Sequence, residues 1–392
     1  MTVAMTLADL CSDIVDCAHK TAPIDESGEH FAVGTPAMRN HIINFSEARR
    51  ISEATFKAWT TRLRPRVGDL LLAREAPVGP VVRIPESENV APGQRTVLLR
   101  PRAGTCDSRF LYYFLTSPRV QAELQVKAAG STVPHLNVAD VRTLPADAVP
   151  PLAEQRAIAE VLGALDDKIA ANARSADIVD ELLATRFARL SAGRARVGLG
   201  TIASVNQRST KPQAGGTLRY LDISSVGRGV YDLPAESSWD DAPGRARRLV
   251  AQGDVVWSTV RPNRRSHALV LDDDDKLIGS TGLAVLTPAP GRTAGLYEAT
   301  RTDGFVAYLE TVAEGSAYPA VRAERFLEAP VPELDPKEWD QFEVLALPLR
   351  EHVHASKVES RRLAAARDEL LPLLMSGKAR VKDAEKTVEG VL

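Results

Sequence analysis

The chain repeats itself at half its length, and this feature constrains its fold more than any other. The segment LSAGRARV, which begins at Leu190, returns as LMSGKARV at Leu374, an offset of 184 residues. Three further pairs follow at offsets of 185, 185 and 188: GDLLLAR with GDVVWSTVR, AGSTVP with EGSAYP, and DELLATRF with DELLPLLM. Because a repeat of this kind decides the architecture, the sequence predicts one structural unit present twice, with small insertions.

Length and composition agree with a duplicated globular protein. A chain of 392 residues is expected to hold at least two domains, since single cores seldom grow beyond about 250 to 300 residues. No apolar run approaches the roughly 20 residues that span a bilayer. The N-terminus lacks the basic start and long apolar core of a secretory signal, so we expect a cytoplasmic protein without a membrane partner. Cys11, Cys17 and Cys106 form no CxxC pair, and buried free thiols are predicted.

The overall charge does not mark the chain as a nucleic-acid-binding protein. Lysine and arginine number 49 against 51 acidic residues, for a net charge of −2. No long segment is strongly basic either. Any affinity for DNA would therefore come from the local placement of arginines or from the field of a partner protein.

The first part of each copy, about 140 residues long, mixes short β-like runs, turns rich in Gly and Pro, and helices. In the first copy we predict strands at 67–74 and 94–102 and a helix at 108–130. In the second copy we predict strands at 218–226, 253–260 and 282–289 and a helix at 302–315.

The second part of the first copy is predicted to be one long helix. Pro150 and Pro151 suit its first turn, and Gly193 is a C-cap signal. A seam with alternating spacings of four and three residues, typical of a coiled coil, runs through it. About 40 helical residues would span roughly 60 Å. Asn172 and Arg186 are the two polar breaks in this seam, which comprises Ile158, Leu162, Leu165, Ile169, Asn172, Ala176, Val179, Leu183, Arg186 and Leu190.

The second copy ends in a weaker version of the same helix. Pro348 is expected to start or kink it, and Pro372 to end or bend it. Its apolar stripe comprises Leu349, Val353, Leu363, Leu370 and Leu374. The two long helices are predicted to pack antiparallel. The alternative is that both lie on a globular core, but the stripe is narrow and its length is sustained.

The predicted fold class is therefore mixed α/β: two globular domains joined by a two-helix antiparallel coiled-coil rod, with a pseudo-twofold internal repeat. The boundaries that we expect are 1–149 for the first globular domain, 150–194 for the central helix, 195–338 for the second globular domain, 339–378 for the distal helix and 379–392 for a C-terminal tail.

Several stretches resemble a known family. LPADAVPPLAEQRAIAEVLGALDDKIAANAR is similar to the central conserved helix of the DNA specificity subunit of type I restriction–modification systems, and LLPLLMSGKARV to the distal conserved segment of that family. DIVDCAHKTAP, RPRVGDLLLAREAPVG and RYLDISSVGRGVYD resemble stretches of its target-recognition domains. The distal helix departs from the pattern at Pro348 and HVHASK, and the chain also carries an acidic run at 272–275.

The resemblance implies a protein with two target-recognition domains, each reading one half of a split site in double-stranded DNA. It implies that the helical rod sets their spacing and docks two methyltransferase subunits, and it leaves restriction/translocase subunits as further partners. S-adenosylmethionine for adenine methylation, and ATP with Mg for cleavage, would be bound by those partners. No cofactor is expected on this chain.

No catalytic or metal-binding motif is evident. The sequence contains no phosphate-binding loop of the form GxxxxGK[ST] and no GxGxxG. It also lacks an Asn-Pro-Pro-aromatic tetrapeptide. His352 and His354 are two residues apart and so point to different faces of a helix. The run DDDDK at 272–276 is read as a solvated cluster of charges in a loop. No catalytic residue and no metal ligand are therefore predicted.

Candidate DNA contacts are local. Arginine pairs with guanine, asparagine with adenine, and both with phosphate. The loops after the two Gly-Asp turns, at Gly68-Asp69 and Gly253-Asp254, are the leading candidates. The candidate residues are His19, Lys20, Arg39, Asn40, Arg74, Glu75, Ser131 and Thr132 in the first copy, and Arg261, Asn263, Arg264, Arg265, Ser316 and Tyr318 in the second.

Two other functions remain open at this point. One is an enzyme with a duplicated domain and an unfamiliar active site, which would be active as an isolated chain with a metal. The other is a non-catalytic scaffold of a related defence complex without its own base readout. In a scaffold, Arg74→Ala and Arg261→Ala would leave assembly and sequence preference unchanged.

Overall fold

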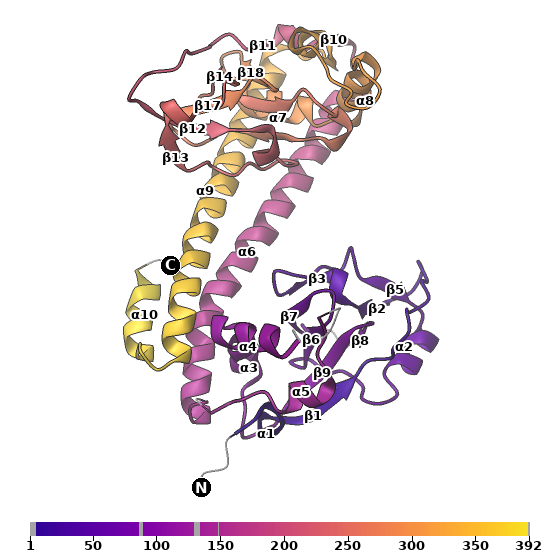
Figure 1. The fold of residues 1–392 in the computed structure, drawn as a ribbon. Coiled ribbons are helices and arrows are strands. Elements are labelled where there is room, and N and C mark those ends of the chain that lie inside the picture. The colour runs from indigo at the N-terminus through magenta and orange to yellow at the C-terminus, as the bar shows by residue number, and fades with distance from the viewer. Residues whose placement is uncertain (1–4, 86–88, 129–133, 148, 391–392) are drawn as a thin grey trace. The chain divides into compact units, whose positions relative to one another are not determined.

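The computed structural model describes residues 5–85, 89–128, 134–147 and 149–390. The chain forms two compact units (Figure 1): unit 1 comprises Met1–Ala170 with Glu359–Leu392, and unit 2 comprises Ala171–Val358. Two long helices, α6 (Leu152–Ser191) and α9 (Pro336–Met375), each contribute one part to each unit. Among the described residues, none of the helices is both long and apolar enough to span a bilayer.

Unit 1 is built on an antiparallel sheet with the strand order β1-β9-β6-β7. Its strands are β1 (Cys11–Asp16), β9 (Thr96–Pro101), β6 (Leu70–Arg74) and β7 (Val78–Arg83). Two helices cover one face, α3 (Ser108–Thr116) and α4 (Pro118–Ala128), where one helix was predicted. The break falls at Ser117 because the proline that follows disfavours a helical conformation in the residue before it.

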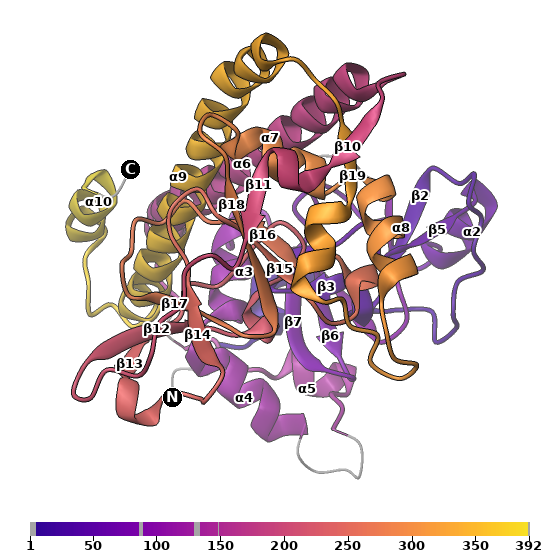
Figure 2. The ribbon, with the colours of Figure 1, turned by 90° about the horizontal axis from the view of Figure 1, so that it is seen from above.

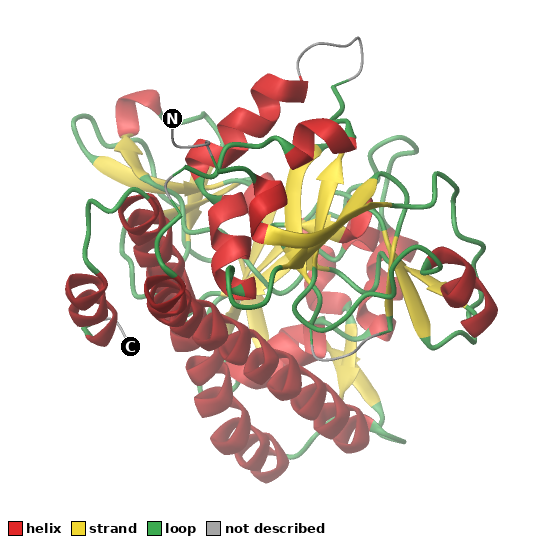
Figure 3. Ribbon diagram, turned by 90° about the horizontal axis from the view of Figure 1, so that it is seen from below, coloured by secondary structure: helices red, strands yellow, loops and turns green. Residues whose placement is uncertain are grey.

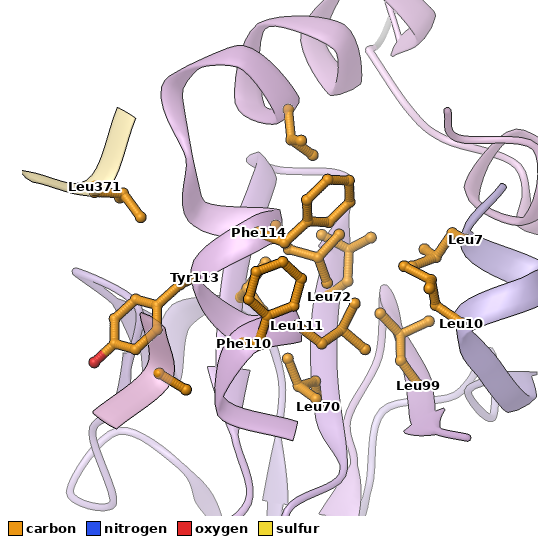
Figure 4. Packing of buried hydrophobic residues seen from close by; sticks show 14 of the residues in the cluster. Leu7, Leu10, Leu70, Leu72, Leu99, Phe110, Leu111, Tyr113, Phe114 and Leu371 are labelled. Carbon is orange, nitrogen blue, oxygen red and sulfur yellow. The ribbon is translucent and has the colours of Figure 1, made fainter. Parts of the chain in front are cut away.

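A second, smaller sheet covers the other face of this sheet. Its order is β5-β2-β8, with β2 parallel to β8. Leu70 and Leu72 of β6 pack with α3 (Figure 4), whereas Leu71 and Ala73 join the cluster that includes Val33. Because β6 is buried on both faces, its sequence is a continuous apolar run rather than an alternating one. The strands of this sheet are β5 (Arg49–Ile51), β2 (His30–Val33) and β8 (Val90–Pro92).

Short elements complete unit 1. Helix α10 buries Ala384 and Val388 in the same core as Leu371 and Leu374, and lies beside the end of α9 (Figure 2). The segment expected to be a C-terminal tail therefore contains a packed helix. The short elements are α1 (Leu7–Leu10), η1 (Thr35–Ala37), β3 (Met38–Arg39), β4 (Ile42–Ile43), α2 (Glu53–Trp59), α5 (Val138–Arg142) and α10 (Val381–Glu389).

Unit 2 repeats this layering. Its main sheet has the antiparallel order β11-β18-β15-β16, and its second sheet has the order β13-β12-β17-β14, with β12 parallel to β17. Val255 and Trp257 pack toward the helices, and Val256 packs toward the second sheet. The elements are β10 (Arg196–Gly198), η2 (Leu199–Thr201), β11 (Ala203–Val205), β12 (Thr217–Leu221), η3 (Ile223–Ser225), β13 (Glu236–Ser238), η4 (Trp239–Asp241), β14 (Ala246–Leu249), β15 (Val255–Ser258), η5 (Pro262–Arg264), β16 (His267–Leu269), β17 (Leu277–Ser280), β18 (Leu283–Pro288), α7 (Thr293–Thr300), α8 (Asp303–Val312), η6 (Ala323–Glu328) and β19 (Pro330–Pro332).

The Gly-Asp turns of the two copies have the same construction. Gly68 and Gly253 have φ values of +90° and +91°, in the left-handed region that favours glycine. Asp69 and Asp254 are buried, and each accepts a hydrogen bond of 2.9 Å from the backbone N–H three residues earlier. The internal repeat predicted from the sequence is thus confirmed in the hydrogen bonding of single turns.

The long helices pair antiparallel within each unit, where their portions lie side by side (Figures 1 and 3). In unit 1, Asp166 accepts a hydrogen bond of 2.7 Å from Arg367, and two residues further along α6 Lys168 lies 3.5 Å from Glu359. In unit 2, the amide of Asn172 donates to the carbonyl oxygen of Ser356 at 3.2 Å, and Asp180 pairs with Arg350. The predicted fold class, mixed α/β with an internal repeat and two long antiparallel helices, is confirmed.

Most of the predicted seam faces the cores of the two units. Residue 186 is where the pattern fails: Arg186 is exposed, and the neighbouring Phe187 is buried with 2% of its surface exposed. A straight α-helix drifts from a strict seven-residue repeat, which moves the buried face by one position over this length. Buried or half-buried seam residues are Ile158, Leu162, Leu165, Ile169, Asn172, Ala176, Val179, Leu183, Leu190, Leu363, Leu370 and Leu374.

Helix α9 corrects the expectation about its prolines. It begins at Pro336, well before Pro348, and continues past Pro372 to Met375. Both internal prolines lie on the exposed side of the helix, where water can hydrate the carbonyl group that each leaves without a partner. Gly377, with φ +68°, provides the left-handed residue just beyond the helix end.

The three cysteines are free and buried, as predicted. Burial raises the pKa of the Cys106 thiol to about 12 and also raises the pKa values of Cys11 and Cys17. These thiols are therefore protonated and unreactive at neutral pH.

Candidate nucleic-acid interface

The two candidate loops are the same structural feature in both copies. In unit 2, a β-bridge joins Val260 to Ala320, and the N–H of Val321 donates to the carbonyl of Thr259 at 2.8 Å. In unit 1, a β-bridge joins Glu75 to His135, and the N–H of Leu136 donates to the carbonyl of Arg74 at 2.9 Å. All four positions correspond at an offset of 185 residues. Main-chain contacts thus hold each loop against the segment that follows the covering helices.

The backbone conformation inside the two loops also corresponds. Ala76 has φ +49° and Arg261 has φ +52°, and each precedes a proline. A left-handed conformation costs a residue with a side chain roughly 1 kcal/mol, so it persists only where the surroundings impose it. Such strain is commonest at binding and catalytic sites.

The loop of unit 2 presents an arginine stacked on an exposed tyrosine. The guanidinium carbon of Arg261 lies 4.4 Å from the ring centroid of Tyr318, whose exposed fraction is 68%. Asn263 and Arg264 are exposed in the short helix η5, and Ser316 is exposed on the neighbouring loop. This arrangement offers guanidinium, amide and aromatic groups to a ligand on one surface.

Arg265 has a different position. It is half-buried, it pairs with Asp303 at the start of α8, and it has φ +54°. Its side chain therefore lies between the loop and α8, apart from the Arg261–Tyr318 pair.

The loop of unit 1 uses its charged side chains largely for support. The Arg74 guanidinium lies 2.9 Å from Asp16 and donates to the carbonyl of Leu136 at 2.8 Å, with its side chain mostly enclosed. Glu75 pairs with Arg95 at 2.7 Å, and the exposed His19 ring lies 2.8 Å from Asp16. Arg74 thus positions the loop through the backbone of Leu136.

The remaining candidates of unit 1 are scattered. Lys20 is exposed beside His19. Arg39 and Asn40 are exposed at the β3–β4 hairpin, which meets β7 through a hydrogen bond of 3.1 Å from the N–H of Val81 to His41. Ser131 and Thr132 lie outside the described residues.

Sequence reasoning missed Arg95, which lies beside the same loop. It has φ +70°, and its carbonyl accepts a hydrogen bond of 2.8 Å from the N–H of Arg74. The segment PGQRTV shows a turn, but not that this turn packs against a loop twenty residues earlier. Only the strand order places the two together.

Asp16, Cys17 and His19 bring three potential metal-ligand atoms within 4.8 Å of one another. The chemistry of this set disfavours a cation. The guanidinium of Arg74 already lies against Asp16, and burial raises the pKa of the Cys17 thiol, so that the thiolate needed for metal binding is scarce.

The acidic run at 272–276 is less solvated than predicted. Asp272 accepts a hydrogen bond from the Tyr231 hydroxyl and lies 3.4 Å from His354, and Asp274 lies 2.8 Å from Arg219. Only Asp273 and Asp275 of the four aspartates are exposed. Two of the carboxylates are therefore structural, because each is paired with a side chain on a neighbouring segment.

Comparison with known proteins agrees with this construction. Residues 39–178 match the family model of the type I restriction modification DNA specificity domain. The fold resembles the crystal structure of a type I restriction-modification system S subunit from M. genitalium, at 18% identity and a TM-score of 0.61, over 95% of each chain. The crystal structure of an HsdS subunit from Thermoanaerobacter tengcongensis also matches, at 17% identity and a TM-score of 0.35, over 96% of each chain. None of the curated proteins matches the chain.

The matched residues and the fold both resemble the DNA specificity subunits of type I restriction–modification systems. The resemblance predicted from the sequence is confirmed by the match over residues 39–178. The second half, outside the matched residues, repeats the strand order and the Gly-Asp turn of the first.

Proposed function

We propose that this chain is the non-catalytic, cytoplasmic specificity subunit of a type I restriction–modification complex, which reads a bipartite DNA site and directs partner methyltransferase and nuclease subunits to it. The observation that carries the proposal is the pair of equivalent loops, held by the same main-chain contacts in both copies. The specificity domain matched over residues 39–178 supports the same reading.

Each loop would read one half of the site. The scaffold is shared, but the side chains differ: Arg261, Asn263 and Arg264 in unit 2 correspond to an Ala-Pro turn flanked by Glu75 and Arg95 in unit 1. Arginine recognises the O6 and N7 atoms of guanine, and asparagine recognises adenine. Two different side-chain sets on one scaffold favour two different half-sites, and hence an asymmetric target.

The partners would dock on the long helices. Ile178 of α6 and Val344 of α9 are 66% and 79% exposed, and Leu182, one turn after Ile178, is also exposed. Exposed apolar side chains grouped on a helix mark contact surfaces for proteins. On the resemblance to the family, we propose methyltransferase subunits as occupants. S-adenosylmethionine, and ATP with Mg for cleavage, would be bound by those partners.

Mapping of methylated adenines by long-read sequencing tests the function. The chain would be expressed with the methyltransferase encoded beside it, and a strain without this chain serves as control. We expect two short specific blocks around a gap of constant length, present only with the chain. Methylation that persists without the chain would contradict the proposal. Assembly with the methyltransferase but no methylated motif would favour the scaffold.

A further inference from the structure

Unit 2 contains a second group of polar side chains, separate from the exposed Arg261–Tyr318 pair. A pocket of about 630 Å³ lies between the end of α6, the junction of α7 and α8, and the start of β16. Four arginines and two carboxylates line it, which gives a net charge of +2. These charged residues are Arg196, Arg228, Arg265, Arg301, Glu298 and Asp303.

Two of the four arginines are available to a ligand. Arg301 is held by Asp180 and Glu298, and Arg265 pairs with Asp303. Arg196 and Arg228 are exposed, and neither has an ion pair within the described part of the chain. The backbone of the Arg228 segment is secured, because the N–H of His267 donates to Gly227 and the N–H of Gly229 donates to His267.

His267 gives the pocket an acceptor without a donor. Its ring is 2% exposed, lines the pocket and stacks on Trp257 with a centroid separation of 4.6 Å. The Nδ1 atom lies 2.7 Å from the carbonyl oxygen of Arg265. A carbonyl only accepts, so Nδ1 carries the proton and Nε2 has a lone pair. Among the described residues, nothing donates to that buried Nε2.

The first copy shows that the fold does not require this histidine. The strand register places Trp257 opposite His267 in unit 2 and Leu72 opposite Val81 in unit 1. Leu72 and Val81 are both fully buried. An apolar pair therefore satisfies the same sheet position, and a buried polar group without a donor is destabilising unless a ligand supplies one.

We propose that this pocket binds a phosphate group that carries a P–OH, as inorganic phosphate and phosphate monoesters both do. The guanidinium groups of Arg196 and Arg228 and the first-turn amides of α8, at Asp303 and Gly304, would bind its anionic oxygens. The protonated oxygen of its monoanion would donate to Nε2 of His267. A phosphodiester of the DNA backbone has no P–OH group, so the missing donor distinguishes a monoester from duplex DNA. A volume of this size also accommodates a nucleotide.

Calorimetric titration of the full chain at pH 6.5 tests the proposal, with inorganic phosphate and adenosine monophosphate as probes. We expect saturable binding, weakened about tenfold by His267→Val and by Arg228→Gln. Arg325→Gln, at an exposed arginine outside the pocket that pairs with Glu328, should leave this binding unchanged. Because His267→Val could disturb the core, Arg228→Gln provides the independent surface variant. If only inorganic phosphate binds, the ligand is the free anion; if both bind, it is an esterified phosphate.

Three results would overturn the proposal: no saturable binding of either probe, equal affinities in wild type and both pocket variants, or displacement of the probe by an unphosphorylated DNA duplex. The proposal does not depend on DNA recognition. The affinity of the assembled complex for its target is measured separately, so that failure of either proposal leaves the other standing.

Discussion

At the scale of single residues, the two loops place their arginines in different surroundings. Arg74 is enclosed by Asp16 and the backbone of Leu136, whereas Arg264 extends into solvent from η5. Both were candidates of the same kind in the sequence. Their different roles follow from burial, because an arginine already paired with a carboxylate has fewer donors left for DNA.

The first prediction concerns Arg264. In the assembled complex, Arg264→Ala is expected to weaken binding to the cognate site by about 1–3 kcal/mol if it reads a base, and to relax methylation at one position of one half-site. The matched control is Arg325→Ala, which removes an exposed arginine paired with Glu328. Filter binding and methylation mapping measure the two effects. Equal losses in the two variants would argue against a role for the η5 loop.

The second prediction concerns His267 and pH. Burial, together with the nearby cations of Arg301 and Arg228, lowers the pKa of its imidazole to about 4, although the Arg265 carbonyl and the Asp180 carboxylate act in the opposite direction. The unfolded chain binds a proton below about pH 6.5, while the folded chain does not until about pH 4. Stability should therefore decrease as the pH falls through this window, by up to roughly 3 kcal/mol.

Urea unfolding of the full chain at pH 7 and at pH 4.5 measures this effect. In the His267→Val variant the decrease should be smaller, since no imidazole remains at that position. An identical pH dependence in the two proteins would show that other groups dominate acid unfolding.

At the scale of elements, neighbouring turns of a long helix carry both buried and exposed apolar side chains. Leu183 is fully buried in unit 2, whereas Ile178 points away from that core. The two positions therefore distinguish folding from partner docking.

The third prediction uses that pair. Leu183→Asp should destabilise the protein by more than about 3 kcal/mol, because it places a carboxylate in an apolar core. Ile178→Asp should leave the unfolding transition nearly unchanged but reduce co-purification with the methyltransferase. Circular dichroism and pull-down measure the two properties. Normal assembly of Ile178→Asp would exclude this face of α6 as the docking surface.

The fourth prediction concerns the prolines of α9. Pro348 lies inside the helix, so Pro348→Ala should stabilise the protein, by up to about 3 kcal/mol. Pro336→Ala should have little effect, because Pro336 occupies the first position of the helix, which proline favours. Thermal unfolding compares the two. A lower melting temperature for Pro348→Ala would mean that the proline is part of the packing.

The helices also show what can be predicted from the sequence. The spacing of Leu162, Leu165 and Leu183 is regular enough to predict a buried face. Phe187, and not Arg186, lies in that buried face, because a small rotation per turn accumulates over the helix. Helix α9 continues through Pro348 because that residue is exposed to solvent. The local sequence around a proline does not reveal whether it will be exposed.

At the scale of the whole molecule, duplication was the most informative signal. The Gly-Asp turns at Gly68 and Gly253 can be predicted because both glycines, 185 residues apart, adopt the same left-handed backbone conformation. By contrast, the contribution of Arg95 to the first loop, and the pocket around His267, arise from segments far apart in the sequence. Such sites are created by the long-range pairing of strands, which the local patterns of a single sequence do not reveal.

The fifth prediction concerns the independence of the copies. If residues 1–149 are exchanged for the corresponding segment of another specificity subunit, only one half of the methylated motif should change. Adenine-methylation mapping before and after the exchange measures this. The reciprocal exchange of 195–338 is the matched control and should change the other half. A change in both halves after either exchange would contradict separate reading by the two copies.

The bridges that secure the loops, Glu75 to His135 and Val260 to Ala320, are made by main-chain atoms. The exposed side chains of the unit 2 loop therefore contribute little to the geometry of its backbone. Point mutations at Asn263, Arg264 or Tyr318 are expected to alter target choice with little cost in stability. Under the proposed function, selection for new targets would act on the codons of a few exposed residues, while the rest of the domain remains under structural constraint.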